Sequence, residues 1–454
     1  MFLVSWLLYL VFSIYSMHNI GDINIKNFSK VEGRANLYIK ITGDKVEKVE
    51  FQIAEYKRFY TWAIQGKNIN SLPQVVSRIC GTCSIAHLIC AIEAIEHALG
   101  VEASEQTKIL RKLLIWGLAI RDHALHLYFF ALPDYLGRDS VLEFDEGSEL
   151  EHQLLHDAFA LKRAGNLLCT WIGGRAVHAM YPKVGGFVKW PDRSQQETII
   201  KELSDVRSRV FRALEIFAQD KFNFQRPTNF AALISDDFNF VSGKLRSTHG
   251  WEIAEQNYGD HLARVVVPYS MSSGYILDQA SYMVGSLARL NLNQNNLHVK
   301  TKADCAQYLK RFPAQDIFLN SLAQGIEIIH SIDQSVEILS KLQINDAEAA
   351  ATVTPKESSG VGVIEAPRGL LFYKLDIDGA GLIKGGQIIV PTSQNQINIE
   401  QDVKKLVEDN IAKDKTEIEQ MLEMLIRAYD PCLSCASHFL KVKWEACSIL
   451  SRQE

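Results

Sequence analysis

Apolar and polar residues alternate in "ANLYIKITGDKVEKVEFQIAE", residues 35–55, on both sides of Thr42-Gly43-Asp44. This alternation is typical of two strands that each bury one face, and a central glycine favours a tight turn. Further along, apolar residues recur at helical spacing from Ser84 to Leu99, and Gly100 is a suitable stop. The pattern therefore predicts a β-hairpin and, after it, a buried helix.

Helical spacing dominates the centre of the chain. Ser104 is placed to cap a long helix that ends near Pro133, and further helical patterns dominate residues 150–340. The Gly/Ser-rich stretch "TPKESSGVG", residues 354–362, breaks this pattern.

The C-terminal part changes to a β-like pattern in "LLFYKLDIDGAGLIKGGQIIVP", residues 370–391. Turn signals occur at Asp378-Gly379 and at Gly385-Gly386. One amphipathic helix over about 400–428 follows. We therefore expect an α+β fold that is predominantly helical, with small β regions near both ends.

Charge and cysteine usage narrow the protein class. The net charge of −5 argues against a nucleic-acid partner, because no basic excess is available to neutralise phosphates. Eight cysteines among 454 residues are too few for a disulfide scaffold. Cys169 and Cys305 stand alone and are predicted to be small buried apolar residues. The other six form one group near each end of the chain: Cys80, Cys83 and Cys90, and Cys432, Cys435 and Cys447.

The first residues, 1–16, are apolar and uncharged. They lack the basic start and the small-residue cleavage site of a signal peptide, and they are short for a membrane span. Met17 directly precedes domain-like sequence, so we predict a misassigned start codon, with a membrane anchor as the alternative. The expected location is accordingly cytoplasmic, with membrane association as the alternative.

Two pairs of cysteines can each bind a metal from one turn. They are Cys80 and Cys83 in "RICGTCSIAH" and Cys432 and Cys435 in "DPCLSCASH". Thiolates three residues apart can converge on one metal, and the two arms together supply four sulfurs. The spacing alone leaves structural zinc and an iron–sulfur site open, with a redox dithiol as a third interpretation. The separation of the arms favours a buried catalytic centre over a zinc ribbon, whose arms lie close in sequence.

A histidine follows each arm, His87 after the first and His438 after the second. Histidines beside a metal often orient its ligands, whereas a histidine considered alone is commonly a hydrogen-bonded core residue. The spacing of the histidines from the cysteines leaves both interpretations open.

Together the two cysteine motifs resemble the paired signatures of the large subunit of nickel–iron hydrogenases. The resemblance covers nearly the whole chain and includes these further motifs: "KVEG", "DHALHLYFFALPDYLG", "GGRAVH", "LARLNLN", "EAPRG" and "PTSQN". It implies one hydrogenase large-subunit domain over 17–438 and a tail, 439–454, that a maturation endoprotease removes. It also implies reversible heterolytic cleavage of H2. The electrons would pass first to an iron–sulfur small subunit, then to acceptor subunits that the sequence does not identify.

By this resemblance, Cys80 and Cys432 are terminal nickel ligands. Cys83 and Cys435 bridge nickel to an iron that carries cyanide and carbon monoxide. Soft thiolates suit a nickel centre that changes redox state.

The resemblance assigns further residues to the centre. Arg368 in "EAPRG" would place a cation at the open metal position or act as a base, with Asp122 and Asp430 beside it. Pro367, Pro391 and Thr392 are assigned to the cofactor pocket, the last two lining the diatomic ligands. Taken alone, the arginine could be a structural ion-pair partner and Asp430 an Asp-Pro turn residue.

Glu32 in "KVEG" resembles the family's proton-relay glutamate, although a glutamate at a strand start is commonly a solvated residue. Three positions depart from the family pattern. Thr61 stands where the family has a glutamate that helps His438 bind magnesium or a second iron, Ala179 replaces a proline, and "VPYSMSSGY" lacks a lysine.

Three other functions compete with hydrogen catalysis. A hydrogen-sensing regulatory subunit would share the same metal centre. The related respiratory NADH dehydrogenase subunit shares the fold but lacks the two cysteine pairs. A structural zinc protein would leave the arginine and proline motifs unexplained.

Overall fold

The computed structural model describes residues 21–55, 60–145, 147–219, 222 and 224–437. The predicted hairpin is present as two antiparallel strands, with Thr42 opposite Lys45 at the turn. A short third strand pairs with the first strand of the hairpin and completes a three-stranded sheet. The strands are β1 (Ile23–Ile25), β2 (Ala35–Thr42) and β3 (Lys45–Ile53).

The buried helix that follows the first cysteine arm also has the predicted bounds. It is α4 (Ser84–Leu99), and Gly100 ends it in the left-handed conformation with φ 67°. Nearly every residue of α4 is buried, because β12 and β13 pack against the helix. Two short helices and a 3-10 turn precede it: α2 (Tyr60–Ala63), α3 (Leu72–Val76) and η1 (Ser77–Ile79).

The next helix differs from the prediction at its end. The Ser104 side chain caps α5 (Glu105–Leu125) as expected, by accepting from the Thr107 N–H. The chain then continues as a π-helical segment, His126–Ala131, and as α6 (Leu132–Leu136). Pro133 does not stop it, because a proline in the first turn of a helix lacks only an N–H that would be unpaired there.

Helix dominates residues 150–340 as predicted, but not residues 229–283, where the chain forms mainly short strands. This segment forms a four-stranded sheet in the order β11-β6-β7-β8 and a separate β9-β10 pair. Most of its strands are too short to show a period of two, and the longest, β6, is buried at five consecutive positions and so does not alternate. They are β6 (Asn229–Ile234), β7 (Lys244–Ser247), β8 (Glu252–Ala254), β9 (Leu262–Val265), β10 (Gly274–Leu277) and β11 (Tyr282–Met283).

Except for the short α10, the α-helices of this part of the chain lie outside 229–283. The helices are α7 (Glu149–Gly173), α8 (Gln196–Arg207), α9 (Val210–Phe217), α10 (Tyr258–His261), α11 (Ser286–Asn293), α12 (Val299–Asp304), α13 (Ala306–Leu309) and α14 (Leu319–Lys341). A two-stranded ribbon, β4 (Pro182–Lys183) and β5 (Gly186–Phe187), interrupts them.

The C-terminal β region forms a three-stranded antiparallel sheet. Its strands are β12 (Ser358–Ala366), β13 (Gly369–Ile377) and β14 (Ile383–Ile389). The turn predicted at Asp378-Gly379 is confirmed, whereas Gly385-Gly386 lies inside β14. A Cβ atom at Gly386 would lie 2.8 Å from the Lys374 carbonyl oxygen, so glycine at this position allows β13 and β14 to pair closely.

Two helices replace the single one predicted near residues 400–428. They are α15 (Pro391–Asp409) and α16 (Lys415–Ala428), and the Asp414 side chain caps the second by accepting from the Thr416 N–H. The described chain ends in α17 (Leu433–Ala436), which carries the second cysteine arm.

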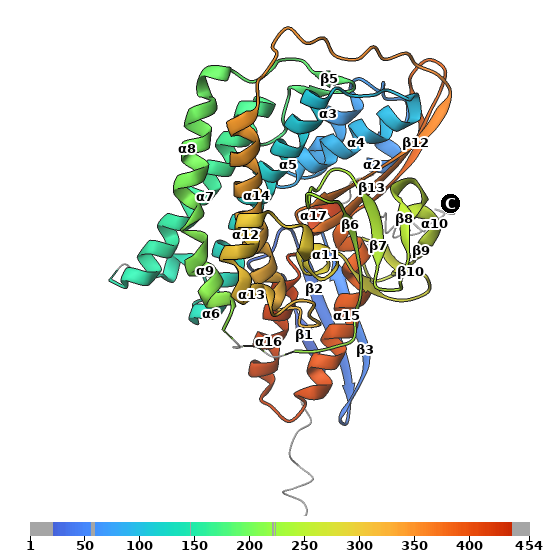
Figure 1. The fold of residues 1–454 in the computed structure, drawn as a ribbon. Helices are drawn as coiled ribbons and strands as arrows, with labels where there is room; N and C mark the ends of the chain where they lie inside the picture. The colour runs from blue at the N-terminus through green and yellow to red at the C-terminus, as the bar shows by residue number, and fades with distance from the viewer. Residues whose placement is uncertain (1–20, 56–59, 146, 220–221, 223, 438–454) are drawn as a thin grey trace, which may run out of the picture.

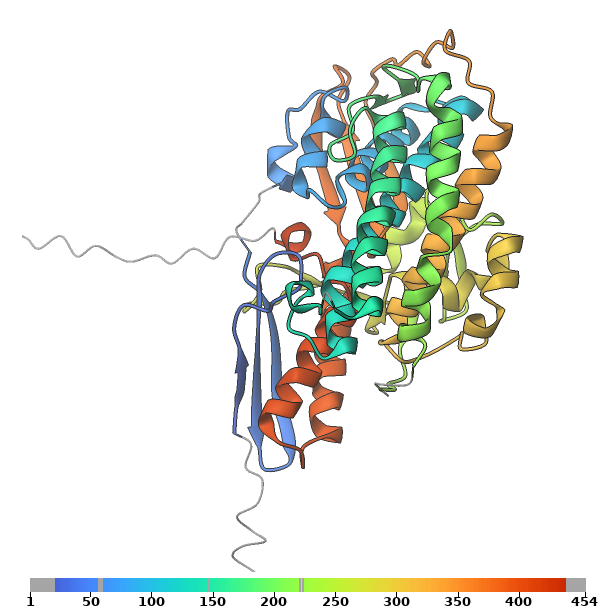
Figure 2. The same ribbon diagram turned by 90° about the vertical axis from the view of Figure 1, so that its left-hand side faces the viewer.

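The elements surround a large apolar core that includes both cysteine arms. The long helices α5, α7, α8 and α14 form one side of the molecule, and the β1–β3 sheet lies beside α15 and α16 at one end (Figures 1 and 2). The α+β, mostly helical fold with β regions near both ends is confirmed, with the 229–283 sheets as an addition. Among the described residues, none of the helices is both long and apolar enough to cross a membrane.

Candidate metal centre

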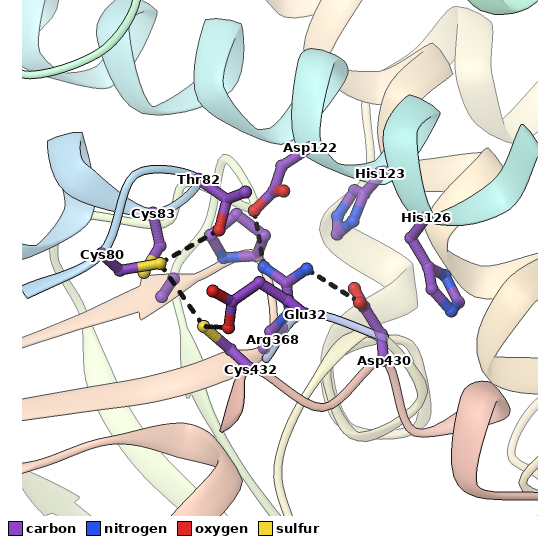
Figure 3. A network of polar contacts seen from close by, with 12 residues as sticks. Glu32, Cys80, Thr82, Cys83, Asp122, His123, His126, Arg368, Asp430 and Cys432 are labelled. Atoms are coloured by element: carbon purple, nitrogen blue, oxygen red, sulfur yellow. Dashed lines mark hydrogen bonds and ion pairs between the residues drawn. The ribbon is translucent and has the colours of Figure 1, made fainter. Parts of the chain in front are cut away.

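The two cysteine arms meet at the centre of the molecule. Their four Sγ atoms lie within 4.8 Å of one another, and all four residues are buried. Cys83 lies 3.1 Å from Cys435, and Cys432 lies 3.0 Å from Cys435 and 3.5 Å from Cys80, measured between Sγ atoms. Figure 3 shows three of these residues approaching from their two chain segments. The fold therefore assembles the four-sulfur site that the sequence predicts.

The electrostatics of the four thiols favour a cation between them. Hydrogen bonding from Cys432 and the other two thiols holds the pKa of Cys80 well below its usual value. Burial raises the pKa of Cys432 and of Cys435 well above theirs. Four thiolates in so dry a space need a metal to balance their charge. A set of soft sulfur donors without a carboxylate among them fits nickel and iron.

Glu32 contacts the second arm through both its backbone and its side chain. Its carbonyl oxygen accepts from the Leu433 N–H at 2.8 Å. Its Oε2 atom accepts from the Cys432 thiol at 3.0 Å (Figure 3). The same atom accepts from the Ser434 N–H at 3.1 Å. Burial raises the pKa of this carboxyl group. The "KVEG" segment thus lies directly against the cysteine arm.

Gly33 allows this close approach. Its φ is +90°, and a Cβ atom there would lie 2.9 Å from both Leu433 Cβ and Ser434 N. Only glycine satisfies both conditions without displacing the arm.

Arg368 lies between two carboxylates beside the sulfurs. Its Nη1 donates to Asp122 Oδ2 at 2.8 Å, and its Nη2 lies 2.9 Å from Asp430 Oδ1 (Figure 3). All three side chains are at most 3% exposed. Although burial disfavours a charged guanidinium, the two carboxylates hold the pKa of Arg368 well above its usual value. The two carboxylates thus hold the guanidinium from both sides, next to the sulfurs.

A second arginine, Arg289, holds the segment that carries Arg368. It is fully buried and forms ion pairs with Glu327 at 2.6 Å and Glu365 at 2.7 Å. Its remaining N–H groups donate to the backbone oxygens of Ala366 at 3.2 Å and Pro367 at 2.9 Å. The "LARLNLN" motif contains this residue, but no pattern in the sequence indicated its role.

Gln324 holds Asp430 in a similar way. Its Nε2 donates to Asp430 Oδ2 at 3.0 Å, and its carbonyl oxygen faces His126 Nδ1. The support matters because Asp430 has φ +52°, which is costly for a residue with a side chain. The "LAQGIEIIH" stretch also contains Glu327 and His330, so the sequence did not single out Gln324.

Polar side chains from distant segments anchor the second arm. The Thr392 Oγ1 atom accepts from the Cys432 N–H at 2.8 Å, which leaves its own O–H free to donate. The Tyr60 hydroxyl donates to the Cys435 carbonyl oxygen at 3.0 Å. Pro391 begins α15 next to Thr392 and is buried, as is Pro367. No sequence pattern pointed to Tyr60.

His87 lies beside the second arm although it follows the first. Its Nε2 is 3.5 Å from Cys435 Sγ, and its Nδ1 is 2.7 Å from the Tyr373 hydroxyl. Burial lowers the pKa of His87 to about 4, so the ring is neutral at pH 7. The structure thus places this histidine where it can orient a thiolate.

The first arm has partners of its own. Thr82 Oγ1 lies 3.1 Å from Cys80 Sγ, and Arg121 donates to the Thr82 carbonyl oxygen. Of the isolated cysteines, Cys169 and Cys305 are buried as predicted.

The third metal site stays a prediction. His438 lies outside the described residues, and Thr61 is half-buried in α2. Ala179 is fully buried, and its backbone oxygen accepts from Gln74 at 2.9 Å.

Comparison with known proteins agrees with this geometry. The family model described as nickel-dependent hydrogenase matches residues 60–158 and 244–438, more than half of the chain. The alpha chain of sulfhydrogenase 1 from Pyrococcus furiosus is 30% identical over 430 residues, covering 92% of this chain and 98% of that protein. The matching component of the vhc F420-non-reducing hydrogenase from Methanococcus voltae is 27% identical over 451 residues, covering 92% and 94%.

Solved structures share the fold. A crystal structure of an NAD+-reducing [NiFe]-hydrogenase in the H2-reduced state matches with a TM-score of 0.80 and 23% identity, covering 92% of this chain and 99% of that one. A Ni-Fe-Se hydrogenase from D. vulgaris Hildenborough matches with a TM-score of 0.74. From the family match, the relatives and the converging cysteine arms, we conclude that this chain belongs to the nickel-dependent hydrogenase family and is a hydrogenase large subunit, an oxidoreductase.

Proposed function

We propose that the chain is the catalytic subunit that cleaves H2 reversibly and heterolytically, at a nickel–iron pair held by the four cysteines. Cys80 and Cys432 are the terminal nickel ligands, and Cys83 and Cys435 bridge to an iron with cyanide and carbon monoxide ligands. The observation that supports this most is the site itself: four buried sulfurs within 4.8 Å, beside a buried arginine. The proposed bridging sulfurs are 3.1 Å apart, so both can reach the same two metals.

When bound, the metal pair supplies the open coordination position at which hydrogen is polarised. Arg368 contributes a positive charge that does not have to reorganise, because Asp122 and Asp430 fix it from two sides. A preorganised charge in a water-excluded site is worth far more than the same charge in water. We assign Arg368 to this electrostatic role, with the two aspartates holding it.

Glu32 is proposed to take the proton away from the centre. Its Oε2 atom is 3.0 Å from the Cys432 sulfur, within direct proton-transfer distance. Glu32 is half-buried, so it contacts the Cys432 sulfur while part of the residue remains accessible to solvent. No other carboxylate among the described residues has a hydrogen bond to one of the four sulfurs.

Thr392, Pro391 and Pro367 are proposed to form the pocket for the diatomic iron ligands. The Thr392 hydroxyl accepts from Cys432 and keeps its proton available for a cyanide nitrogen. The two prolines offer apolar surface without a backbone N–H to compete for that ligand.

Electrons must leave through another chain. Within the described residues, only the four cysteines of the centre form a group of three or more metal-binding side chains, so this part of the chain offers no iron–sulfur relay. The P. furiosus relative is named as one lettered component of its enzyme, alpha, which supports a multi-subunit assembly. We propose that the direct partner is an iron–sulfur small subunit, with acceptor subunits beyond it.

The proposal is tested by hydrogen-dependent dye reduction with the purified complex. We expect sustained turnover that stops when hydrogen is replaced by argon. A complex that binds hydrogen but does not sustain turnover would favour the hydrogen-sensing alternative.

The tail 439–454 is proposed to be removed during maturation. Cys435 is only 2% exposed, and the arm that carries it is held by Tyr60 at the Cys435 carbonyl oxygen and by Glu32 at the Ser434 N–H. We propose that this arm enters the core after the metals are inserted. We predict that intact-mass measurement of the active complex shows a chain that ends at His438. A fully active chain that retains Glu454 would contradict cleavage.

A further inference from the structure

Two exposed histidines face each other on α7, outside the metal centre. His152 and His156 are four residues apart, so they lie on the same side of consecutive turns. Their Nε2 atoms are 3.2 Å apart, and their ring centroids are 4.5 Å apart. Figure 1 shows α7 on the outer side of the helical layer.

The fold does not require this arrangement. The opposite face of α7 packs on α5 through buried residues such as Leu154, Ala158 and Leu161. The two imidazoles are in contact with solvent, and either ring could turn to water. Within the described part of the chain, neither ring makes another hydrogen bond or an ion pair. Two ring nitrogens at this distance repel each other unless a proton or a metal ion lies between them.

We propose that His152 and His156 chelate a divalent late transition-metal ion at the surface. With metal–nitrogen bonds of about 2.0–2.1 Å, a 3.2 Å separation gives an angle at the metal of about 100°. This angle lies between the square-planar and tetrahedral values, so copper, nickel and zinc all fit. The helix supplies the spacing, and the two Nε2 atoms are already close enough to share one metal ion.

The site is open and exchangeable, in contrast to the buried centre. No third histidine, cysteine or carboxylate of the described residues joins the pair in a ligand cluster, so water fills the other positions. Two neutral imidazoles should bind copper most tightly and nickel and zinc more weakly, following the general order for nitrogen ligands. If the complex is not washed with a chelator, the measured nickel per chain should therefore exceed the nickel held by the buried centre.

The test uses the complete complex after a wash with EDTA, titrated with nickel chloride in a calorimeter. We expect one exchangeable nickel per chain in addition to the buried metals. H152A and H156A should each weaken this binding by about tenfold or more, because each removes one of only two protein ligands. Q153A, on the same helix between the two, is the matched control and should bind as the unaltered chain does.

Copper provides a second, independent readout. Electron paramagnetic resonance of one added Cu2+ per chain should show two nitrogen ligands, reduced in either histidine variant. Unchanged nickel binding in both histidine variants, or no exchangeable nickel in the unaltered complex, would overturn the proposal and leave an N–H···N hydrogen bond between the rings. Circular dichroism checks that the variants remain folded. We expect them to be folded because substitutions at exposed positions usually change stability little.

Discussion

The two cysteine arms have the same spacing but are held in different ways. The first arm is set by local structure: Cys80 directly follows the η1 turn, and Cys83 is the N-cap residue of α4. Because α4 is a long and almost wholly buried helix, the position of this arm follows from the helix that begins there.

The second arm depends on residues far away in sequence. Its backbone and sulfur atoms are bound by Glu32, Thr392 and Tyr60, which come from three separate segments. Its own helix, α17, is only four residues long and cannot fix the arm alone. We therefore propose that the first arm is preformed and that the second arm closes onto it after the metals are inserted.

Loss of a bridging sulfur is expected to have the largest effect. Cys435→Ser and Cys83→Ser should each abolish hydrogen turnover and empty the centre, because a hard oxygen bridges soft metals poorly. Nickel and iron analysis of the purified complex checks this. Cys90→Ser is the matched control, since Cys90 is a buried thiol of α4 that donates only to the backbone oxygens of Gly362 and Leu371. If Cys435→Ser retained both metals, the second arm would not be part of the centre.

Arg368→Lys is expected to lower turnover by about a hundredfold or more, with metal content unchanged. The ammonium group of lysine is a single point, so it cannot contact Asp122 and Asp430 together as the guanidinium does. Turnover and metal content are measured on the same preparation. Arg111→Lys, at a buried arginine paired with Glu96 away from the centre, should affect stability but not turnover. Normal turnover in Arg368→Lys would make this arginine purely structural.

Glu32→Gln separates the chemical role of the "KVEG" segment from its role in holding the second arm. The amide can keep the contact with Ser434 but cannot relay a proton, so we expect assembled metals and proton exchange reduced by about a hundredfold. Hydrogen–deuterium exchange and dye reduction are the readouts. Glu47→Gln, an exposed glutamate of β3 paired with Lys40, is the control. Exchange near the level of the unaltered enzyme would remove Glu32 from the relay.

A pair of glycine variants tests the difference between the arms directly. Gly33→Ala should cost roughly 1–2 kcal/mol of stability from its positive φ, and its Cβ would also displace the second arm. We expect severalfold less nickel per chain. Gly81→Ala, inside the first arm, meets no atom within 4 Å and should load nickel normally. Equal loading of the two variants would contradict the proposed difference between a preformed and a closing arm.

Sequence patterns predicted the long helices and strands and the metal centre. They failed for short strands and for contacts between residues that are distant in the sequence. The hairpin and α4 were predictable because each has many residues in one period. The strands between 229 and 283 were not, because each offers only a few positions. The spacing of the four cysteines indicated a metal site, whereas Arg368 and its aspartates were identified through motif resemblance.

The residues that hold the site were the part that sequence did not reveal. Tyr60 and Gln324 act through contacts with residues more than 100 positions away, and no local pattern encodes such contacts. Arg289 lies in a recognised motif, yet only the fold shows that it binds the backbone ahead of Arg368.

We propose that the two cysteine arms together hold one nickel and one iron. Metal analysis of the complex, washed with EDTA to remove weakly held ions and corrected for the metals of its partner subunits, tests it most directly. Infrared spectroscopy of the same sample detects cyanide and carbon monoxide. We predict one nickel and one iron per chain, with both diatomic ligands present. One zinc per chain, with no nickel and no diatomic bands, would contradict it.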